Sequence, residues 1–268
     1  MERLKRTLQY FYLVIIMLFL YAPILVLIVM SFNTSKSRAH WGGFTLSWYT
    51  EMLSNSDILV ALQNTLIIAL ISALAATILG TMAAIAIRNM KPVTRNIIMG
   101  ITNVPMLNAD IVTGISLMLC FIAFKISLGF QTVLIAHITF NIPYVILSVM
   151  PKLKQASQVN YEAALDLGAT PAYAFRKVVL PDIMPGVLSG FLLAFTMSLD
   201  DFIVTHFTRG AGINTISTLV YSEVRRGINP SMYALSTVIF GVIFVVLLLS
   251  NYVPGIMEQM EKKRGQQG

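Results

Sequence analysis

Three carboxylates lie inside apolar runs of this sequence: Asp110, Asp200 and Asp201. A charge at the middle of a membrane costs at least about 2.5–3.5 kcal/mol, so such residues usually face a cavity or a partner. No Lys or Arg lies deep in the same runs. An ion pair at about 4 Å contributes about 4 kcal/mol at an effective dielectric of about 20, so an uncompensated carboxylate favours a cation. These acids predict a pathway for a cationic solute, with ion pairing or an interfacial position as the structural alternative.

The surroundings of the acids differ. Pro105 and Asn108 precede Asp110. Pro removes a helix hydrogen bond and Asn can serve the freed backbone groups, so we expect a broken span with the acid at the break. Asp200 and Asp201 are adjacent, and adjacent residues of a regular helix point about 100° apart. One is expected to face the pathway and the other an interface or water, and the spacing leaves open which.

Other reactive patterns are missing from the sequence. There is no CxxC, no HExxH, no Walker lysine motif and no GxSxG. These motifs mark metal, nucleotide and acyl-transfer sites. We therefore predict no catalytic residue, no metal site and no cofactor bound by this chain, and an intramembrane enzyme is disfavoured.

The composition indicates the elements that must position the acids. Of 268 residues, 56% are hydrophobic and 12% charged, whereas a soluble domain has about 25% charged residues. Six spans of about 20 residues each can be drawn from such a chain. We predict an all-α integral membrane protein with one transmembrane domain over residues 1–268. The expected spans are 8–30, 61–87, 97–124, 132–150, 183–207 and 233–253.

The distribution of basic residues predicts the orientation. The first run is longer than the apolar part of a signal peptide, so we interpret it as a retained span rather than a cleaved signal. With the N-terminus inside, inner segments hold 13 of the 19 Lys and Arg residues and outer segments hold 6. This bias predicts that both termini are cytoplasmic. The net charge of +7 then concerns topology, and no nucleic-acid partner is expected.

The long inner segment 151–182 has helix signals of its own. The stretch Ser157-Gln-Val-Asn160 offers N-cap candidates, Gly168 suits the end of that helix, and Thr170-Pro171 can begin a second one. The second helix is expected to end before Leu180-Pro181, because Pro cannot continue a helix simply. Two short helices with a glycine joint can bind a groove of a soluble partner. The alternative is an interfacial helix on lipid.

This segment also carries a long motif. Its residues are Glu162-Ala163-Ala164, three residues, Gly168, nine residues, Val178, one residue and Leu180-Pro181. The pattern resembles the EAA loop of ABC-importer permeases, except that Val178 stands where the family has Ile. The resemblance implies a six-span type I importer permease with the MetI-like fold and cytoplasmic coupling helices. It also implies that ATP and Mg²⁺ bind to a separate ATPase. The residues it assigns to ATPase coupling are Glu162, Ala163, Ala164, Gly168, Leu180 and Pro181.

A second resemblance concerns the cargo. The stretch Ser198-Leu-Asp200-Asp201, together with Asn33-Thr-Ser and Asn108-Ala-Asp110, is similar to the permeases of spermidine/putrescine importers over nearly the whole chain. It implies a bacterial inner-membrane heterodimer with a second permease, two copies of an ATPase and an external polyamine-binding protein. Asp110 and Asp200 are the expected polyamine contacts. His206 departs from the family pattern, and a lone His at a span end is more often structural.

Two other readings stay open. The importer could carry another small solute, such as an opine, an amino-acid derivative or ferric iron. The chain could instead be a proton-coupled secondary transporter that uses the three acids as a relay. That reading predicts transport without ATP hydrolysis.

Overall fold

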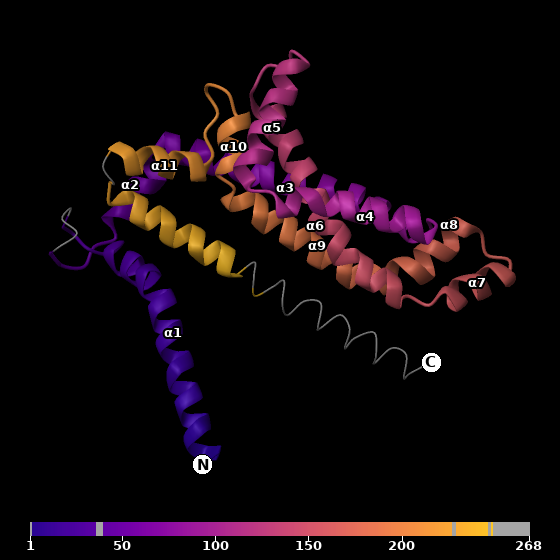
Figure 1. Cartoon of the computed structure of the whole chain (residues 1–268). Helices are drawn as coiled ribbons and strands as arrows, with labels where there is room; N and C mark the ends of the chain where they lie inside the picture. The colour runs from indigo at the N-terminus through magenta and orange to yellow at the C-terminus, as the bar shows by residue number, and fades with distance from the viewer. Residues whose placement is uncertain (1, 36–39, 227–228, 246–247, 249–268) are drawn as a thin grey trace. The chain divides into compact units, whose positions relative to one another are not determined.

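The computed structural model of the 268-residue chain describes residues 2–35, 40–226, 229–245 and 248 (Figure 1). All regular elements formed by these residues are helices, and one isolated bridge joins Asn33 to Phe44. The predicted all-α fold class is therefore confirmed. The elements are α1 (Glu2–Met30), α2 (Ser47–Ser54), α3 (Ser56–Arg88), α4 (Pro92–Leu107), α5 (Asp110–Ala123), α6 (Phe130–Gln155), α7 (Gln158–Asp166), α8 (Pro171–Ala174), the π-helical turn η1 (Phe175–Val179), α9 (Leu180–Asp200), α10 (Ile203–Thr208) and α11 (Ile216–Arg226).

The membrane-spanning helices correspond to the predicted apolar runs. Four are long and apolar enough to cross a bilayer: Leu8–Met30, Ser56–Arg88, Phe130–Gln155 and Pro171–Asp200. Helices α4 and α5 together meet the same length and composition test, and they bend by 104° at the break between them, the geometry of a broken span or a re-entrant loop. The predicted break at Asp110 is confirmed, since α5 begins at that residue. The sixth run forms a shorter apolar helix, Ser231–Val245, and the rest of its predicted range lies, apart from residue 248, outside the described residues.

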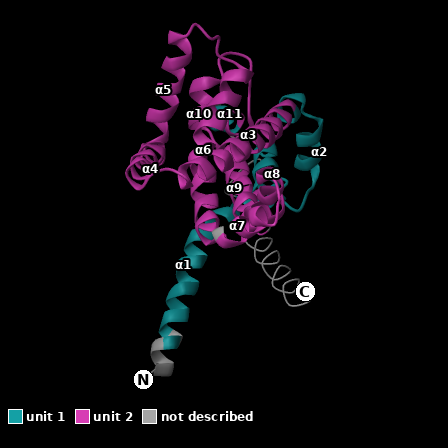
Figure 2. Ribbon diagram, turned by 90° about the vertical axis from the view of Figure 1, so that its right-hand side faces the viewer, with its two compact units in different colours: residues 1–59, 220–242 teal, residues 60–219, 243–268 magenta. Residues whose placement is uncertain are grey.

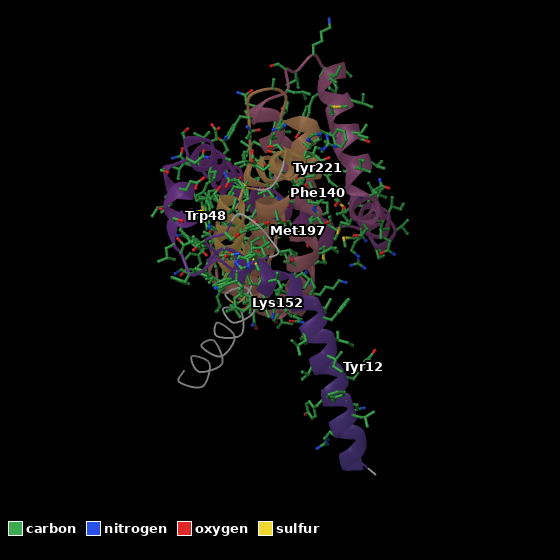
Figure 3. The ribbon with its side chains drawn as sticks, turned by 90° about the vertical axis from the view of Figure 1, so that its left-hand side faces the viewer. Tyr12, Trp48, Phe140, Lys152, Met197 and Tyr221 are labelled. Atoms are coloured by element: carbon green, nitrogen blue, oxygen red, sulfur yellow. The ribbon has the colours of Figure 1, made fainter. Side chains whose placement is uncertain are left out.

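The chain divides into two compact units (Figure 2): residues 1–59 with 220–242, and residues 60–219 with 243–268. In the first unit, Asn33 organises the segment after α1. Its side-chain oxygen accepts from the N–H of Gly42 at 2.8 Å, and its amide donates to the carbonyl of His40 at 2.8 Å. Trp48 Nε1 donates to the Asn33 carbonyl at 2.7 Å. The apolar side chains of α1, among them Tyr12, are exposed along the helix (Figure 3), so this span needs lipid or another protein around it.

Close packing of α6 and α9 forms the centre of the second unit. A Cβ added at Gly186 of α9 would lie 3.0 Å from the Ser148 carbonyl oxygen and 2.9 Å from Lys152 Cγ. Only a residue without a side chain allows this approach, as is common between membrane helices. Small and branched side chains complete the surrounding core, including Ala73, Ala76, Val145, Val149, Ile183 and Ala194.

The range of the fifth predicted span, 183–207, contains two helices and a break. Helix α9 ends at Asp200, Asp201 adopts extended backbone angles, and α10 begins at Ile203. The physical reason is the Asp201 carboxylate, which accepts the N–H groups of Val204 at 3.3 Å and Thr205 at 2.8 Å. A side chain that satisfies the first N–H groups of a helix favours a new start at that point.

Candidate functional site

Two parts of the second unit contain the predicted site residues, and the first is the inner loop. Helix α7 begins after Ser157, whose hydroxyl accepts the N–H of Asn160 at 3.3 Å. Helix α8 begins after Thr170, whose hydroxyl accepts the N–H of Tyr173 at 3.4 Å, and Pro171 is its first residue. Ser157 is therefore the N-cap among the candidates at 157–160, and the predicted cap at Thr170 is confirmed.

Gly168 is the joint between these helices. It has φ +88°, the left-handed region that glycine adopts without a Cβ penalty. Its N–H donates to the Leu165 carbonyl at 2.9 Å, and the N–H of Ala169 donates to the Ala164 carbonyl at 3.0 Å. These two bonds form a Schellman motif, which ends α7 sharply and turns the chain toward α8.

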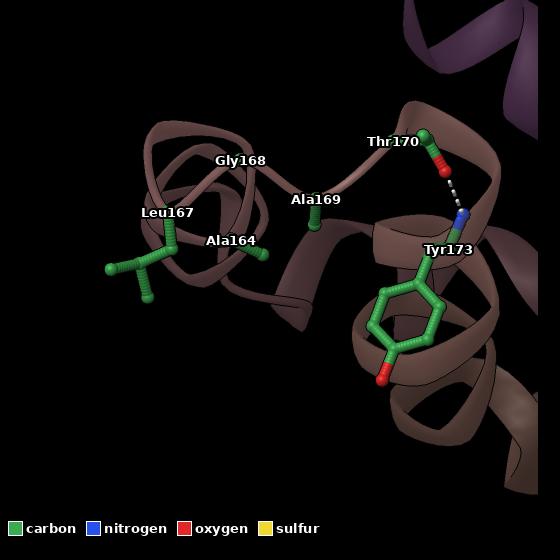
Figure 4. A pocket seen from close by; sticks show the side chains of 6 residues that line it. All are labelled: Ala164, Leu167, Gly168, Ala169, Thr170 and Tyr173. Atoms are coloured by element: carbon green, nitrogen blue, oxygen red, sulfur yellow. Dashed lines mark hydrogen bonds between the residues drawn. The ribbon is translucent and has the colours of Figure 1, made fainter.

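The joint exposes an apolar surface. A shallow hollow of about 550 Å³ is lined by Ala164, Leu167, Gly168, Ala169, Thr170 and Tyr173. Leu167 and Tyr173 lie on opposite sides of it (Figure 4), and their side chains are 90% and 59% exposed. Exposed apolar groups around a concave site are typical of a protein-docking surface.

The end of the inner loop differs from the prediction. The second short helix does not stop before Leu180-Pro181 but continues through the π-helical turn η1 into α9. The backbone N–H of Leu180 donates to the carbonyl of Phe175, five residues earlier. This wider turn precedes Pro181, so the missing N–H of proline falls at the start of α9, where it is tolerated. Leu180 packs against the core cluster, and of the six predicted coupling residues only Ala164 and Gly168 line the hollow.

The membrane acids form the second part. Asp110 is exposed at the first position of α5, and Asp200 is exposed at the last position of α9. A carboxylate at the start of a helix is stabilised by the positive end of the helix dipole. One turn after Asp110, Gly114 packs on α10, where a Cβ would lie 3.1 Å from the Phe207 ring. Asp110 therefore begins a helix, α5, that contacts α10, and Asp200 lies just before α10 in the sequence.

Two aromatic side chains of α6, Phe140 and Tyr144, lie side by side. Tyr144 of α6 is within electrostatic range of the Asp110 carboxylate. Its ring lies 5.3 Å from the ring of Phe140, centroid to centroid. Phe140 is labelled on its ribbon in Figure 3.

Asp201 is held differently from Asp200. Its side chain is only 10% exposed and lies 3.4 Å from Nε2 of His137 in α6. The Thr205 hydroxyl donates to the same carboxylate at 2.9 Å and contacts His137 Nε2 at 2.9 Å. The structural alternative, an acid held by a partner on a neighbouring helix, therefore applies to Asp201.

The other ring nitrogen of His137 extends this arrangement. Nδ1 lies 2.5 Å from the hydroxyl of Ser198 in α9, and that hydroxyl lies 3.1 Å from the hydroxyl of Ser72 in α3. Ser198, His137 and Asp201 are the residue types of a hydrolytic triad. However, Ser198 and His137 are only 4% and 3% exposed, so a substrate carbonyl has no access to the hydroxyl. The arrangement is a structural network.

Sequence reasoning missed His137. The available signal was an ionisable residue inside the predicted span 132–150, because such residues are rare in membranes and usually have a partner. Among the described residues, no group of three or more His, Cys, Asp or Glu side chains could hold a metal ion.

Comparison with known proteins identifies similar sequences. The family model described as "Binding-protein-dependent transport system inner membrane component" matches residues 76–264. The putrescine transport system permease protein PotI of Escherichia coli (strain K12) is 40% identical over 253 residues, which cover 92% of this chain and 89% of that protein. The spermidine/putrescine transport system permease protein PotC of the same strain is 37% identical over 235 residues, which cover 88% and 89%.

Solved structures share the fold at low identity. A chain of a bacterial ABC transporter involved in the import of the acidic polysaccharide alginate matches with a TM-score of 0.65 and 17% identity, over 94% of this chain and 98% of that one. A chain of the inward-facing MetNI methionine ABC transporter matches with a TM-score of 0.61 and 15% identity, over 76% and 99%. The predicted MetI-like importer fold is confirmed.

Proposed function

Because the chain belongs to the family of binding-protein-dependent transport system inner membrane components, we propose that it is the permease subunit of an ATP-driven importer that carries polyamines into the bacterial cytoplasm. The bacterial ABC transporter that shares this fold is involved in the import of alginate, an acidic polysaccharide. The fold alone therefore does not set the charge of the cargo. The proposal rests on the membrane acids and on the putrescine and spermidine permeases that this chain resembles.

The negative charge of the proposed pathway favours a cationic cargo. Asp110 and Asp200 are exposed at helix ends, and neither α5 nor α9 contains a Lys or Arg. A slender polycation can pair with such carboxylates in succession. An anion would instead require Arg, Lys or free helix N-termini. Asp201 supports this pathway from within the protein, since its carboxylate is occupied by His137 and Thr205.

The inner loop is the proposed ATPase contact. Glu162 and Ala163 are exposed on α7, and the hollow at Gly168 presents apolar surface beside them. A short helix with small and apolar residues can lie in a groove of a partner. We assign docking to α7 and its glycine joint, with Leu180 and Pro181 connecting the joint to α9. Both termini and this loop are then cytoplasmic, in agreement with the 13 inner basic residues.

The remaining partners follow from the family and the exposed first span. The complex proposed for this chain contains a second, different permease, two copies of the ATPase and an external polyamine-binding protein. The whole chain 1–268 acts as one transmembrane domain in that complex. The ATPase supplies the ATP and Mg²⁺ site, so the chain itself needs no cofactor.

Neutralising Asp200 tests the cargo. In the reconstituted complex, Asp200→Asn is expected to raise the KM for putrescine about fivefold, because the loss of an exposed ion pair costs up to about 1 kcal/mol. Asp110→Asn is expected to do the same. The measurement is putrescine-stimulated ATP hydrolysis together with uptake of labelled putrescine.

Asp182→Asn is the matched control, since it removes the same charge from the first turn of α9, at the other end of the helix from Asp200. Its KM is expected to equal that of the unmodified complex. An unchanged KM in both the Asp110 and Asp200 variants would refute the pathway assignment. Uptake driven by a proton gradient without ATP would refute the importer and favour the secondary transporter.

A further inference from the structure

A buried chain of polar side chains crosses the second unit. It joins α3, α6, α9 and α10 through the residues Ser72, His137, Ser198, Asp201 and Thr205. The hydroxyl and imidazole members are between 0% and 4% exposed. Buried polar groups are stable only when their hydrogen bonds are made. These hydrogen-bonded side chains therefore restrain the relative positions of the helices that carry them.

The donors and acceptors can be assigned by satisfying each group. Thr205 donates its hydroxyl hydrogen to Asp201, so His137 Nε2 must be the donor in its contact with Thr205. In the neutral imidazole Nδ1 is then an acceptor, and Ser198 donates to it. Donation therefore runs toward the Asp201 carboxylate, and the one imidazole both accepts from α9 and donates to α10.

The break between α9 and α10 lies between the two residues that contact the His137 ring, Ser198 and Thr205. Ser198 is in the last turn of α9, and Asp201 caps the first turn of α10. Ser217 also donates to the Asp201 carbonyl at 2.7 Å. Asp200 is the last residue of α9, directly before this break. The apolar sequence of residues 183–207 would otherwise favour one continuous helix, which would redirect the Asp200 side chain.

We propose that His137 is a positioning residue that keeps the α9–α10 break open and so sets the direction in which Asp200 presents its carboxylate. The proposal rests on the proposed function, in which Asp200 contacts an ammonium group of the cargo. His137 itself stays inside the protein and does not contact the cargo. Its role depends on having an acceptor for Ser198 and a donor for Thr205 in a single side chain.

The test compares His137→Leu with His137→Gln in the complete complex reconstituted in liposomes. Leu fills the space without polar atoms, whereas the Gln amide can accept from Ser198 and donate toward Thr205 and Asp201. His137→Leu is expected to raise the KM for putrescine about tenfold, because the three buried partners lose their bonds. His137→Gln is expected to stay within about threefold of the unmodified complex. Thr139→Val is the control, since its exposed hydroxyl bonds only the carbonyl of Ile135 in the same helix.

A second readout needs no cargo. The exposed Cys120 is first replaced by alanine, and Asp200→Cys is then labelled with a trimethylammonium methanethiosulfonate. His137→Leu is expected to change the labelling rate about tenfold, and Thr205→Val, which removes the two hydroxyl bonds of Thr205 to His137 and Asp201, about threefold. His137→Gln is expected to preserve the rate.

The two readouts separate the possible failures. If the unmodified complex imports no polyamine, the proposed function fails while labelling still tests the position of residue 200. Equal labelling rates in the unmodified, Leu and Gln forms would overturn the positioning role. The positioning role would also be overturned if His137→Leu and His137→Gln changed the KM for putrescine and the labelling rate equally. Hydrogen bonding by residue 137 would then not be the cause of the change. If His137→Leu fails to assemble, Thr205→Val decides, and an unchanged labelling rate in that variant overturns the proposal.

Discussion

Replacing Leu167 by aspartate is expected to lower ATP-driven uptake at least about a hundredfold, because an unpaired carboxylate would be buried in the docked interface. Leu167 is 90% exposed at the C-terminal end of α7, beside the hollow formed at Gly168. A large apolar side chain in that position contributes most to the free energy of binding when a partner covers it. The measurement is uptake by the reconstituted complex, with co-purification of the ATPase as a direct readout of docking.

The matched control is Leu167→Met, which keeps an apolar side chain of similar volume. This variant is expected to transport at nearly the unmodified rate. Neither change should affect folding of the chain, since Leu167 is exposed and its backbone N–H bonds the Ala163 carbonyl in every variant. Normal uptake and normal ATPase binding by Leu167→Asp would show that the docking surface lies elsewhere.

Gly210→Ala is expected to destabilise the permease by about 2–4 kcal/mol, from backbone strain and overpacking together. Gly210 follows α10 with φ +63°, in the left-handed region. A Cβ there would lie 2.4 Å from the Leu128 carbonyl oxygen and 2.8 Å from its carbonyl carbon. The neighbouring Thr208 carbonyl accepts from the Thr132 hydroxyl at 2.7 Å, so a shift of the turn would disturb the contact between α10 and α6. Thermal unfolding of the purified complex measures the loss.

Gly212→Ala provides a control two residues away in the same loop. Gly212 has φ +95°, but no heavy atom lies within 4 Å of its added Cβ. Only backbone strain remains, so a loss of about 1 kcal/mol is expected. If the two alanine variants unfold at the same temperature, the close approach of Gly210 to Leu128 is not present in the complex.

The sequence predicted the elements that depend on neighbouring residues. Apolar runs of sufficient length indicated the spans, because a bilayer requires about 20 apolar residues per helix. Ser157, Gly168 and Thr170 indicated the short inner helices, since capping acts within one turn of the chain. Pro105 and Asn108 indicated the break before Asp110 for the same reason. The assignment of the acids to a substrate pathway and of the EAA loop to ATPase coupling stays a prediction.

Tertiary structure decided which of two adjacent acids is free. In the sequence Asp200 and Asp201 are equivalent neighbours in an apolar run, and a single regular helix is the natural reading of residues 183–207. The position of His137 beside Asp201 depends on the packing of α6 against α9, which joins residues more than 60 positions apart. Helix periodicity and capping act over one or two turns, so they carry no information about that partner. The three acids were visible in the sequence, but a buried imidazole on another helix determines that Asp201 caps α10 while Asp200 remains exposed.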